Sequence, residues 1–149
     1  AEKYIDSPFM VLNGDSFFDA DIDAMADFHF AKRKSFENYV GTMALTEVEN
    51  RSAYGSIIRD ENEIVTTFKE KSPELNSPGL INAGVYLLEP KILEMIPAGR
   101  KVSLEKEIYP KLLEKRLRLG GFASNVFFVD IGTPEGFHRF QEYIKEEVV

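Results

Sequence analysis

The chain has 149 residues, of which 44% are hydrophobic and 29% charged, which suits one ordinary globular domain over residues 1–149. It has no cysteine and no run of about 18 to 20 apolar residues, which argues against disulfides, thiolate metal sites and a membrane partner. The net charge of −7 argues against nucleic acid as a partner, and a chain without cysteine fits the reducing cytoplasm, where we expect it.

The first third of the chain alternates between strand and helix patterns. Residues 9–13 form an apolar run that stops at a Gly-Asp pair, which predicts a buried strand ending in a loop. Residues 19–34 have acidic side chains at their start and basic ones at their end, which favours a helix. Residues 39–45 are predicted to form a second strand.

The rest of the chain continues the alternation. Two β-rich runs, residues 54–58 and 64–68, flank a polar segment and predict a hairpin. Further strands are expected at residues 80–88, 120–122 and 126–130, a proline-containing loop at 72–79, and helices at 91–96, 103–115 and 133–148. This pattern predicts an α/β fold with a mixed, mostly parallel sheet flanked by helices.

Two aspartates occupy equivalent places in this pattern, since Asp15 and Asp130 each follow an apolar strand and each have a glycine beside them. Open α/β sheets place ligands at such strand ends. Asp15 could equally belong to a plain turn, and Asp130 could cap the last helix, although Thr133 is better placed for that. Two carboxylates can share one Mg²⁺, which would let an acidic protein bind phosphates.

Charged and polar side chains in the middle of the chain suggest a sugar phosphate ligand. Glu70 could accept hydrogen bonds from sugar hydroxyls, and Lys71 could reach a phosphate, with Glu70 facing away from Lys71 if the strand continues. A solvated charged edge is the alternative for these residues. Asn82 lies in an apolar strand, where it needs hydrogen-bond partners and could also bind hydroxyls. The histidines, His29 and His138, are expected to be packing or surface residues.

Six short motifs in order give the chain a resemblance to the sugar-1-phosphate nucleotidyltransferases. They are VLNGD at 11–15, YG at 54–55, FKEK at 68–71, INAGVYLLEP at 81–90, SLEKEIYP at 103–110 and FVDIGTPEGF at 128–137. The wording is most similar to mannose-1-phosphate and heptose-1-phosphate guanylyltransferases, with thymidylyl- and other hexose-1-phosphate enzymes still open. The resemblance implies a Rossmann-like nucleotide-diphospho-sugar transferase fold that joins an NTP, here GTP, to a sugar 1-phosphate.

The resemblance also implies roles for individual residues. Asp15 and Asp130 match the aspartates that bind Mg²⁺, and Lys71 matches the lysine that contacts the sugar phosphate. The residues matching positions of the sugar site are Gly55, Glu70, Asn82 and Gly84.

The chain departs from the family pattern at its beginning. The family's Gly-rich nucleotide-binding loop is missing, and residues 1–7 read as the end of a helix, so we expect a fragment that is inactive alone. Loss of the family's first strand would leave an open sheet edge, and we therefore expect a homo-oligomer. The alternatives are a non-catalytic sugar-phosphate binding or regulatory module and a purely structural α/β domain.

Overall fold

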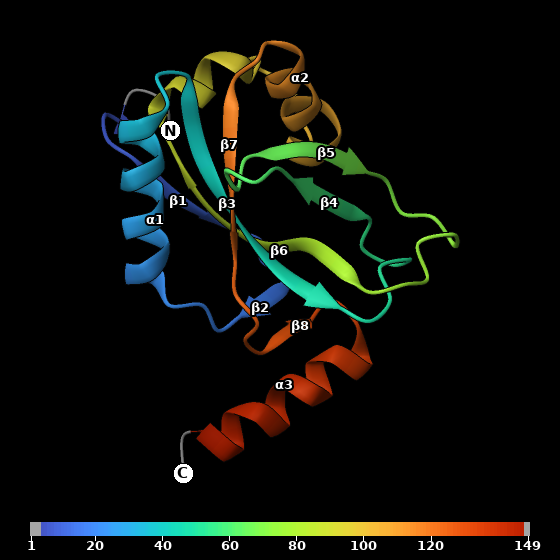
Figure 1. The fold of residues 1–149 in the computed structure, drawn as a ribbon. Coiled ribbons are helices and arrows are strands. Elements are labelled where there is room, and N and C mark those ends of the chain that lie inside the picture. Colours follow the sequence, from blue (N-terminus) through green and yellow to red (C-terminus); the bar gives the residue numbers. More distant parts are fainter. Residues whose placement is uncertain (1–3, 148–149) are drawn as a thin grey trace.

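The computed structural model describes residues 4–147 and is built on a four-stranded sheet with the order β1-β6-β3-β7 (Figure 1). Three of its strands, β1, β3 and β7, run in one direction, and β6 runs in the other, so only the β3–β7 pair is parallel. The expected α/β fold with a mixed sheet is therefore confirmed. The strands are β1 (Phe9–Leu12), β6 (Gly79–Leu88), β3 (Tyr39–Val48) and β7 (Arg118–Ala123).

Two two-stranded ribbons accompany the main sheet. The predicted hairpin is confirmed as β4 (Ser56–Arg59) and β5 (Val65–Lys69). The other ribbon pairs β2 (Ser16–Phe18) with β8 (Phe128–Asp130), and β2 was not predicted. A segment of three residues carries almost no periodic signal, because its strand geometry comes from its pairing with β8.

Helical segments cover both faces of the sheet. The helix α1 (Ile22–Ser35) begins where the Asp21 side chain accepts a hydrogen bond from the Ala24 N–H. On the other face lie the 3₁₀ helix η2 (Pro90–Met95), the π-helical turn η3 (Leu104–Ile108) and α2 (Tyr109–Glu114). Ser103 begins η3 by accepting from the Lys106 N–H, as expected for a cap.

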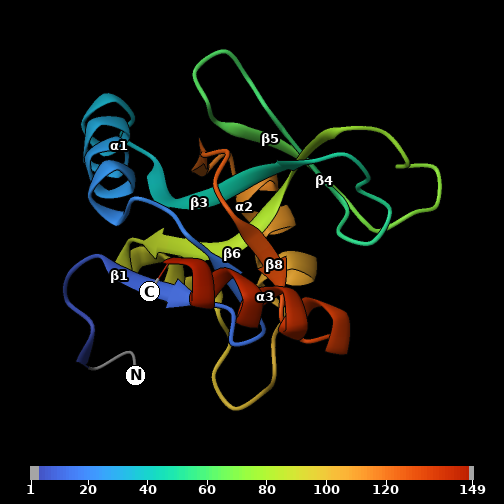
Figure 2. The ribbon, with the colours of Figure 1, turned by 90° about the horizontal axis from the view of Figure 1, so that it is seen from below.

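The last helix, α3 (Pro134–Glu147), lies close to β8 at the lower end of the molecule as drawn in Figure 1, and it is therefore in front in Figure 2, which is seen from below. Thr133 Oγ1 accepts a hydrogen bond from the Gly136 N–H at 3.1 Å, which confirms Thr133 as its cap. Phe140 and Tyr143 hold the helix by packing on the Phe17 ring of β2. Among residues 4–147, no helix combines the length and apolar character that crossing a membrane requires.

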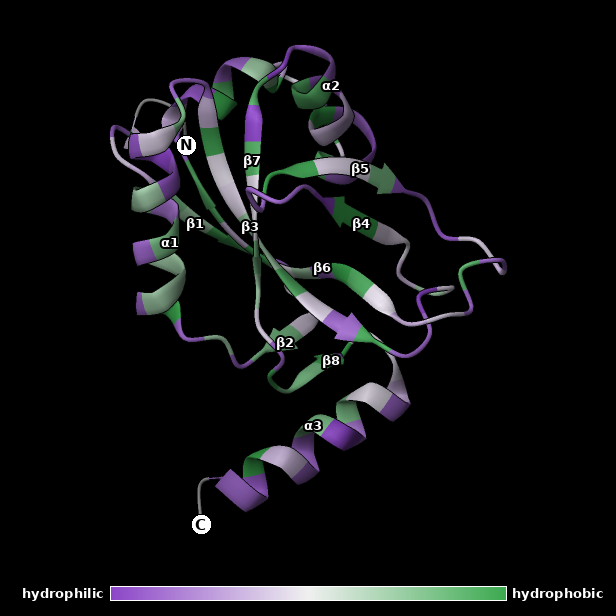
Figure 3. Ribbon diagram, in the orientation of Figure 1, coloured by the Kyte–Doolittle hydropathy of each residue, from purple (hydrophilic) through white to green (hydrophobic). Residues whose placement is uncertain are grey.

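The core lies on both faces of the sheet, and hydrophobic residues recur along its strands (Figure 3). The larger cluster packs η2, η3, α2 and the β4–β5 hairpin against one face. A smaller cluster around Met25 packs α1 and the β2–β8 ribbon against the other. Because both faces are covered, the first eight residues of β3, Tyr39 to Thr46, are all buried rather than alternating with exposed ones.

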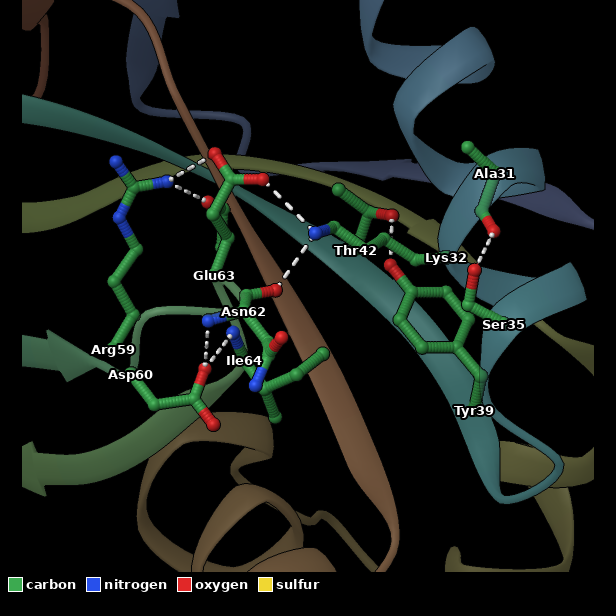
Figure 4. Close-up of polar contacts among 11 residues, drawn as sticks. Ala31, Lys32, Ser35, Tyr39, Thr42, Arg59, Asp60, Asn62, Glu63 and Ile64 are labelled. Atoms are coloured by element: carbon green, nitrogen blue, oxygen red, sulfur yellow. Dashed lines mark hydrogen bonds and ion pairs between the residues drawn. The ribbon is translucent and has the colours of Figure 1, made fainter.

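The turn of the β4–β5 hairpin is tied to α1 (Figure 4). Lys32 Nζ donates to the Asn62 carbonyl at 2.7 Å and forms an ion pair with Glu63 at 2.9 Å. Glu63 also meets Arg59, whose guanidinium donates to the Gly121 carbonyl of β7. These contacts hold the hairpin, and hence the segment after β5, in place against the sheet.

The expectation that residues 1–7 form the end of a helix can be followed from Tyr4 onward, because residues 1–3 lie outside the described part of the chain. Tyr4 lies in a 3₁₀ turn, and residues 5–8 are not helical and lead directly into β1. Pro8 disfavours the α conformation for Ser7, the residue before it.

Candidate functional site

The two predicted aspartates lie together at the lower end of the sheet. Asp130 ends β8, and its strand partner Ser16 directly follows Asp15. The Asp15 carbonyl accepts hydrogen bonds from Ile131 and Gly132 at 2.8 and 3.2 Å. A β-carbon placed on Gly132 would lie 3.1 Å from Asp130 Oδ1 and 3.9 Å from Asp15 Oδ2, so both carboxylates face the same point.

Both carboxylates line one cavity of about 180 Å³. Lys71 and Asn82, which are distant in sequence, line the same cavity. Within residues 4–147, neither aspartate nor Lys71 forms an ion pair, so their charges are free to meet a ligand.

The carboxylate pair fits a hard divalent cation. In the described part of the chain, no group of three or more His, Cys, Asp or Glu side chains could hold a metal, so a cation at this cavity would need further oxygen ligands besides the two aspartates. Asp130 Oδ1 accepts from the Gly132 N–H at 2.9 Å, which fixes the orientation of that carboxylate. Mg²⁺ commonly takes one or two carboxylates and completes its shell with water and substrate phosphate, so these residues suit Mg²⁺.

A second cavity of about 320 Å³ adjoins the first, and the two share Tyr54, Lys71, Asn82 and Glu105. Lys69, Glu70 and Lys71 all line it. The strand β5 ends at Lys69, where the last cross-strand pair is formed, so the continued strand on which Glu70 would face away from Lys71 is not present. Glu70 is 68% exposed and meets Lys106 at 3.7 Å.

Asn82 is fully engaged in hydrogen bonds, as its place in an apolar strand requires. Its Oδ1 accepts from the Gly84 N–H at 3.0 Å, and its Nδ2 donates to Tyr86 Oη and to Glu105 Oε1, each at 2.6 Å. Burial raises the pKa of Tyr86 to about 12, so its hydroxyl stays protonated at neutral pH. Within the chain, both amide hydrogens of Asn82 are already used.

The two predicted glycines lie beneath the cavities rather than on their walls. Gly55 has φ +82°, and a β-carbon there would collide with the Lys69 carbonyl. Gly84 has φ +79°, and a β-carbon there would crowd the Asn13 side chain, which lines the smaller cavity. Both glycines therefore allow close packing behind lining residues and do not themselves line either cavity.

Sequence reasoning missed three further lining residues, Asn13, Tyr54 and Glu105. Asn13 and Tyr54 lie inside quoted motifs, next to Gly14 and Gly55, so their position beside a turn was the available signal. Glu105 lies inside the motif SLEKEIYP at 103–110, for which no site role was expected. Its contact with Asn82 could not be read from the sequence, because the two lie on different elements.

The comparisons agree with the fold. Residues 1–147 match the family model described as nucleotidyl transferase, and the chain therefore belongs to the nucleotidyl transferase family.

Among curated relatives, it is 35% identical over 140 residues to a mannose-1-phosphate guanylyltransferase of Mycobacterium tuberculosis, a match covering 93% of this chain and 37% of the relative. It is 32% identical to a D-glycero-alpha-D-manno-heptose 1-phosphate guanylyltransferase of Campylobacter jejuni, covering 93% of this chain and 57% of the relative. The suspected family is confirmed.

A solved structure of HddC from Yersinia pseudotuberculosis is similar, with a TM-score of 0.75 and 30% identity, covering 96% of this chain and 58% of that one. The same protein in complex with GMP-PN gives a TM-score of 0.73. The chain thus spans between about a third and three fifths of the length of these relatives.

Proposed function

We propose that the chain supplies the sugar-side part of a nucleotidyltransferase, which transfers GMP from GTP to a mannose- or heptose-type sugar 1-phosphate and releases pyrophosphate. The observation that carries this proposal is the convergence of Asp15, Asp130 and Lys71 on one cavity, beside a second cavity that Glu70 lines. Relatives named as guanylyltransferases of mannose and heptose 1-phosphates support the choice of substrates.

The reaction is a direct displacement at phosphorus. An oxygen of the sugar phosphate forms a bond to the α-phosphorus of GTP, and the bond from that phosphorus to the bridging oxygen breaks, so pyrophosphate leaves with the electron pair. No general base is required, because the sugar phosphate is already ionised at neutral pH. Repulsion between two anions is therefore the main obstacle.

The charged residues of the site address that repulsion. Asp15 and Asp130 would hold Mg²⁺, which when bound supplies positive charge beside the reacting phosphates. Lys71 lines both cavities, so its ammonium group can neutralise and position the sugar phosphate between them. Glu70 would hold sugar hydroxyls in the larger cavity, and most of the rate gain would come from positioning.

We further propose that the 149 residues bind sugar 1-phosphate but do not transfer GMP by themselves. The family's Gly-rich nucleotide-binding loop is not among these residues, and the chain spans only part of its relatives. Formation of GDP-sugar from GTP by the purified chain would refute this proposal. A non-catalytic sugar-phosphate binding module would also bind sugar 1-phosphate, but its full-length protein would not transfer GMP.

Binding of mannose 1-phosphate, measured by calorimetry, tests the proposed site. We expect Lys71→Met to weaken binding by about tenfold to a hundredfold, because it removes a charge-assisted contact to the phosphate. Lys34→Met is the matched control, since Lys34 is exposed on α1 away from both cavities. Equal affinities of the two variants, or no binding by the unmodified chain, would contradict the proposed function.

A homo-oligomer is proposed on the basis of β1, whose only pairing among the described residues is with β6. Leu12 on this strand is 64% exposed, and an open apolar strand edge favours pairing with another copy. We expect a dimer in light scattering that Leu12→Lys converts to a monomer, while Ile144→Lys on α3 leaves the dimer intact. A monomeric unmodified chain would contradict this.

A further inference from the structure

Glu105 occupies a central place among the cavities of the site. Besides the two cavities already described, a third of about 450 Å³ lies beside Asp15 and Tyr86. Within the described part of the chain, Glu105 is the one residue that lines all three. It is exposed, and it belongs to the π-helical turn η3.

The hydrogen bonds of Asn82 define what Glu105 offers to a ligand. The Gly84 N–H can only donate, so Asn82 Oδ1 must face it and Nδ2 must face Tyr86 and Glu105. Glu105 Oε1 is thereby held at 2.6 Å from Nδ2, while no residue among 4–147 contacts its Oε2 by a hydrogen bond or ion pair. The carboxylate is thus fixed by one oxygen and presents the other as an acceptor.

A role for Glu105 in holding metal with the aspartates is not supported. Asp15, Asp130 and Glu105 line the same small cavity, yet no group of three such side chains in the described residues is arranged to hold one ion. A carboxylate in this place therefore needs a different ligand group. Sugar hydroxyls are suitable, since they donate hydrogen bonds and carboxylates accept them strongly.

We propose that Glu105 is a second hydroxyl-accepting carboxylate of the sugar site and that, together with Glu70, it selects which sugar 1-phosphate binds. The proposal rests on the proposed function, because it assigns a specificity-determining residue to the same site. Glu70 and Glu105 line the larger cavity with Lys71, so an anionic phosphate would face the lysine and the hydroxyls would face the two carboxylates.

Deoxy sugars test the proposal, because each lacks one hydroxyl. The affinities of mannose 1-phosphate and its 2-, 3-, 4- and 6-deoxy analogues are compared between the unmodified chain, Glu105→Ala and Glu105→Gln. We expect Glu105→Ala to weaken binding of mannose 1-phosphate by about tenfold to a hundredfold. For one deoxy analogue the unmodified chain and Glu105→Ala should bind equally, since the hydroxyl that Glu105 accepts is already gone.

The isosteric variant Glu105→Gln keeps an acceptor for Asn82 and should lose less affinity than Glu105→Ala. Inorganic phosphate is the control ligand, because it is an anion without sugar hydroxyls. Both variants remove a negative charge, so neither should bind inorganic phosphate more weakly than the unmodified chain does. Glu114→Gln at the end of α2 is the matched control and should leave every affinity unchanged. Circular dichroism and thermal unfolding establish that the variants are folded.

The outcomes separate the two proposals. If the unmodified chain binds no sugar 1-phosphate, the proposed function fails and this inference fails with it. If it binds them, but Glu105→Ala and Glu105→Gln weaken no sugar, or weaken every analogue by one common factor, only the role of Glu105 is overturned.

Discussion

Two polar clusters in this molecule are built from residues far apart in sequence, but they differ in how completely their groups are paired. One lies between α1 and the sheet, where buried His29 contacts Glu89 and Thr42, each at 2.9 Å. Tyr39 Oη meets Thr42 Oγ1 at 2.6 Å, and Arg33 meets Glu89 at 3.2 Å. We refer to these five residues as the α1 network.

The other cluster, around Asp15, Asp130 and Lys71, is open, and its charged groups lack ion-pair partners in the described part of the chain. Buried polar groups must satisfy one another, whereas groups that bind a ligand can stay solvated until it arrives. The comparison teaches that the α1 network stabilises the fold, and that the open cluster is available for function.

Removal of His29 should have the largest effect on stability. His29→Ala removes one hydrogen-bond partner each from buried Glu89 and Thr42, which keep Arg33 and Tyr39, and creates a cavity, so we expect the free energy of unfolding to fall by about 3 kcal/mol. Urea unfolding measures this. His138→Ala is the matched control, since His138 is 71% exposed on α3, and it should change stability by less than about 0.5 kcal/mol. Equal losses for the two histidines would contradict the assigned role of the α1 network.

Arg51 lies outside the open cluster but contacts the loops beside it. Its replacement tests whether these contacts hold the loops in place. Its guanidinium donates to Ser56 Oγ at 2.5 Å and to the Ser77 carbonyl and hydroxyl at 2.9 and 2.8 Å, which joins the loops before β4 and before β6. We expect Arg51→Ala to lower the free energy of unfolding by about 1 to 2 kcal/mol, and Arg51→Lys to lose less. Arg139→Ala on α3 should leave the free energy of unfolding almost unchanged. An Arg51→Ala variant as stable as this control would contradict the role of Arg51 in joining the two loops.

The pH dependence of stability should also reflect the α1 network. Burial lowers the pKa of His29 from its ordinary value of 6.5, with Arg33 adding to the effect and Glu89 opposing it. His29 therefore binds a proton more tightly in the unfolded chain than in the folded chain. The contribution of His29 to the free energy of unfolding is complete above about pH 6.5 and declines as the pH falls below that value.

Protonation of His29 alone should give the free energy of unfolding a slope against pH of at most about 1.4 kcal/mol per pH unit. Urea unfolding at a series of pH values should show a smaller slope in His29→Gln than in the unmodified chain. A His29 pKa at or above 6.5 in the folded chain, measured by NMR, would contradict the expected direction.

Local patterns predicted the long elements, and they failed where tertiary contacts decide the outcome. The polarity of charges identified α1, and Thr133 and Pro134 identified the start of α3. The strand β2 was missed because it exists through its pairing with β8.

The same limit applies to the sites. Asp15 and Asp130 could be predicted because each follows an apolar strand pattern, but the partner of His29 could not, since Glu89 lies on a different element. Likewise, the hydrogen bond that gives Glu105 its place in the site joins η3 to β6.

The central claim is that Asp15 and Asp130 bind one divalent cation together, and calorimetric titration with Mg²⁺ in the presence of mannose 1-phosphate tests it most directly. We expect one Mg²⁺ per chain, with Asp15→Asn and Asp130→Asn each weakening binding on the order of 100-fold, about 2.7 kcal/mol, while the free energy of unfolding stays within about 0.5 kcal/mol. Asp27→Asn, on the exposed side of α1, should bind like the unmodified chain. Retention of Mg²⁺ affinity in either site variant would contradict a shared ion.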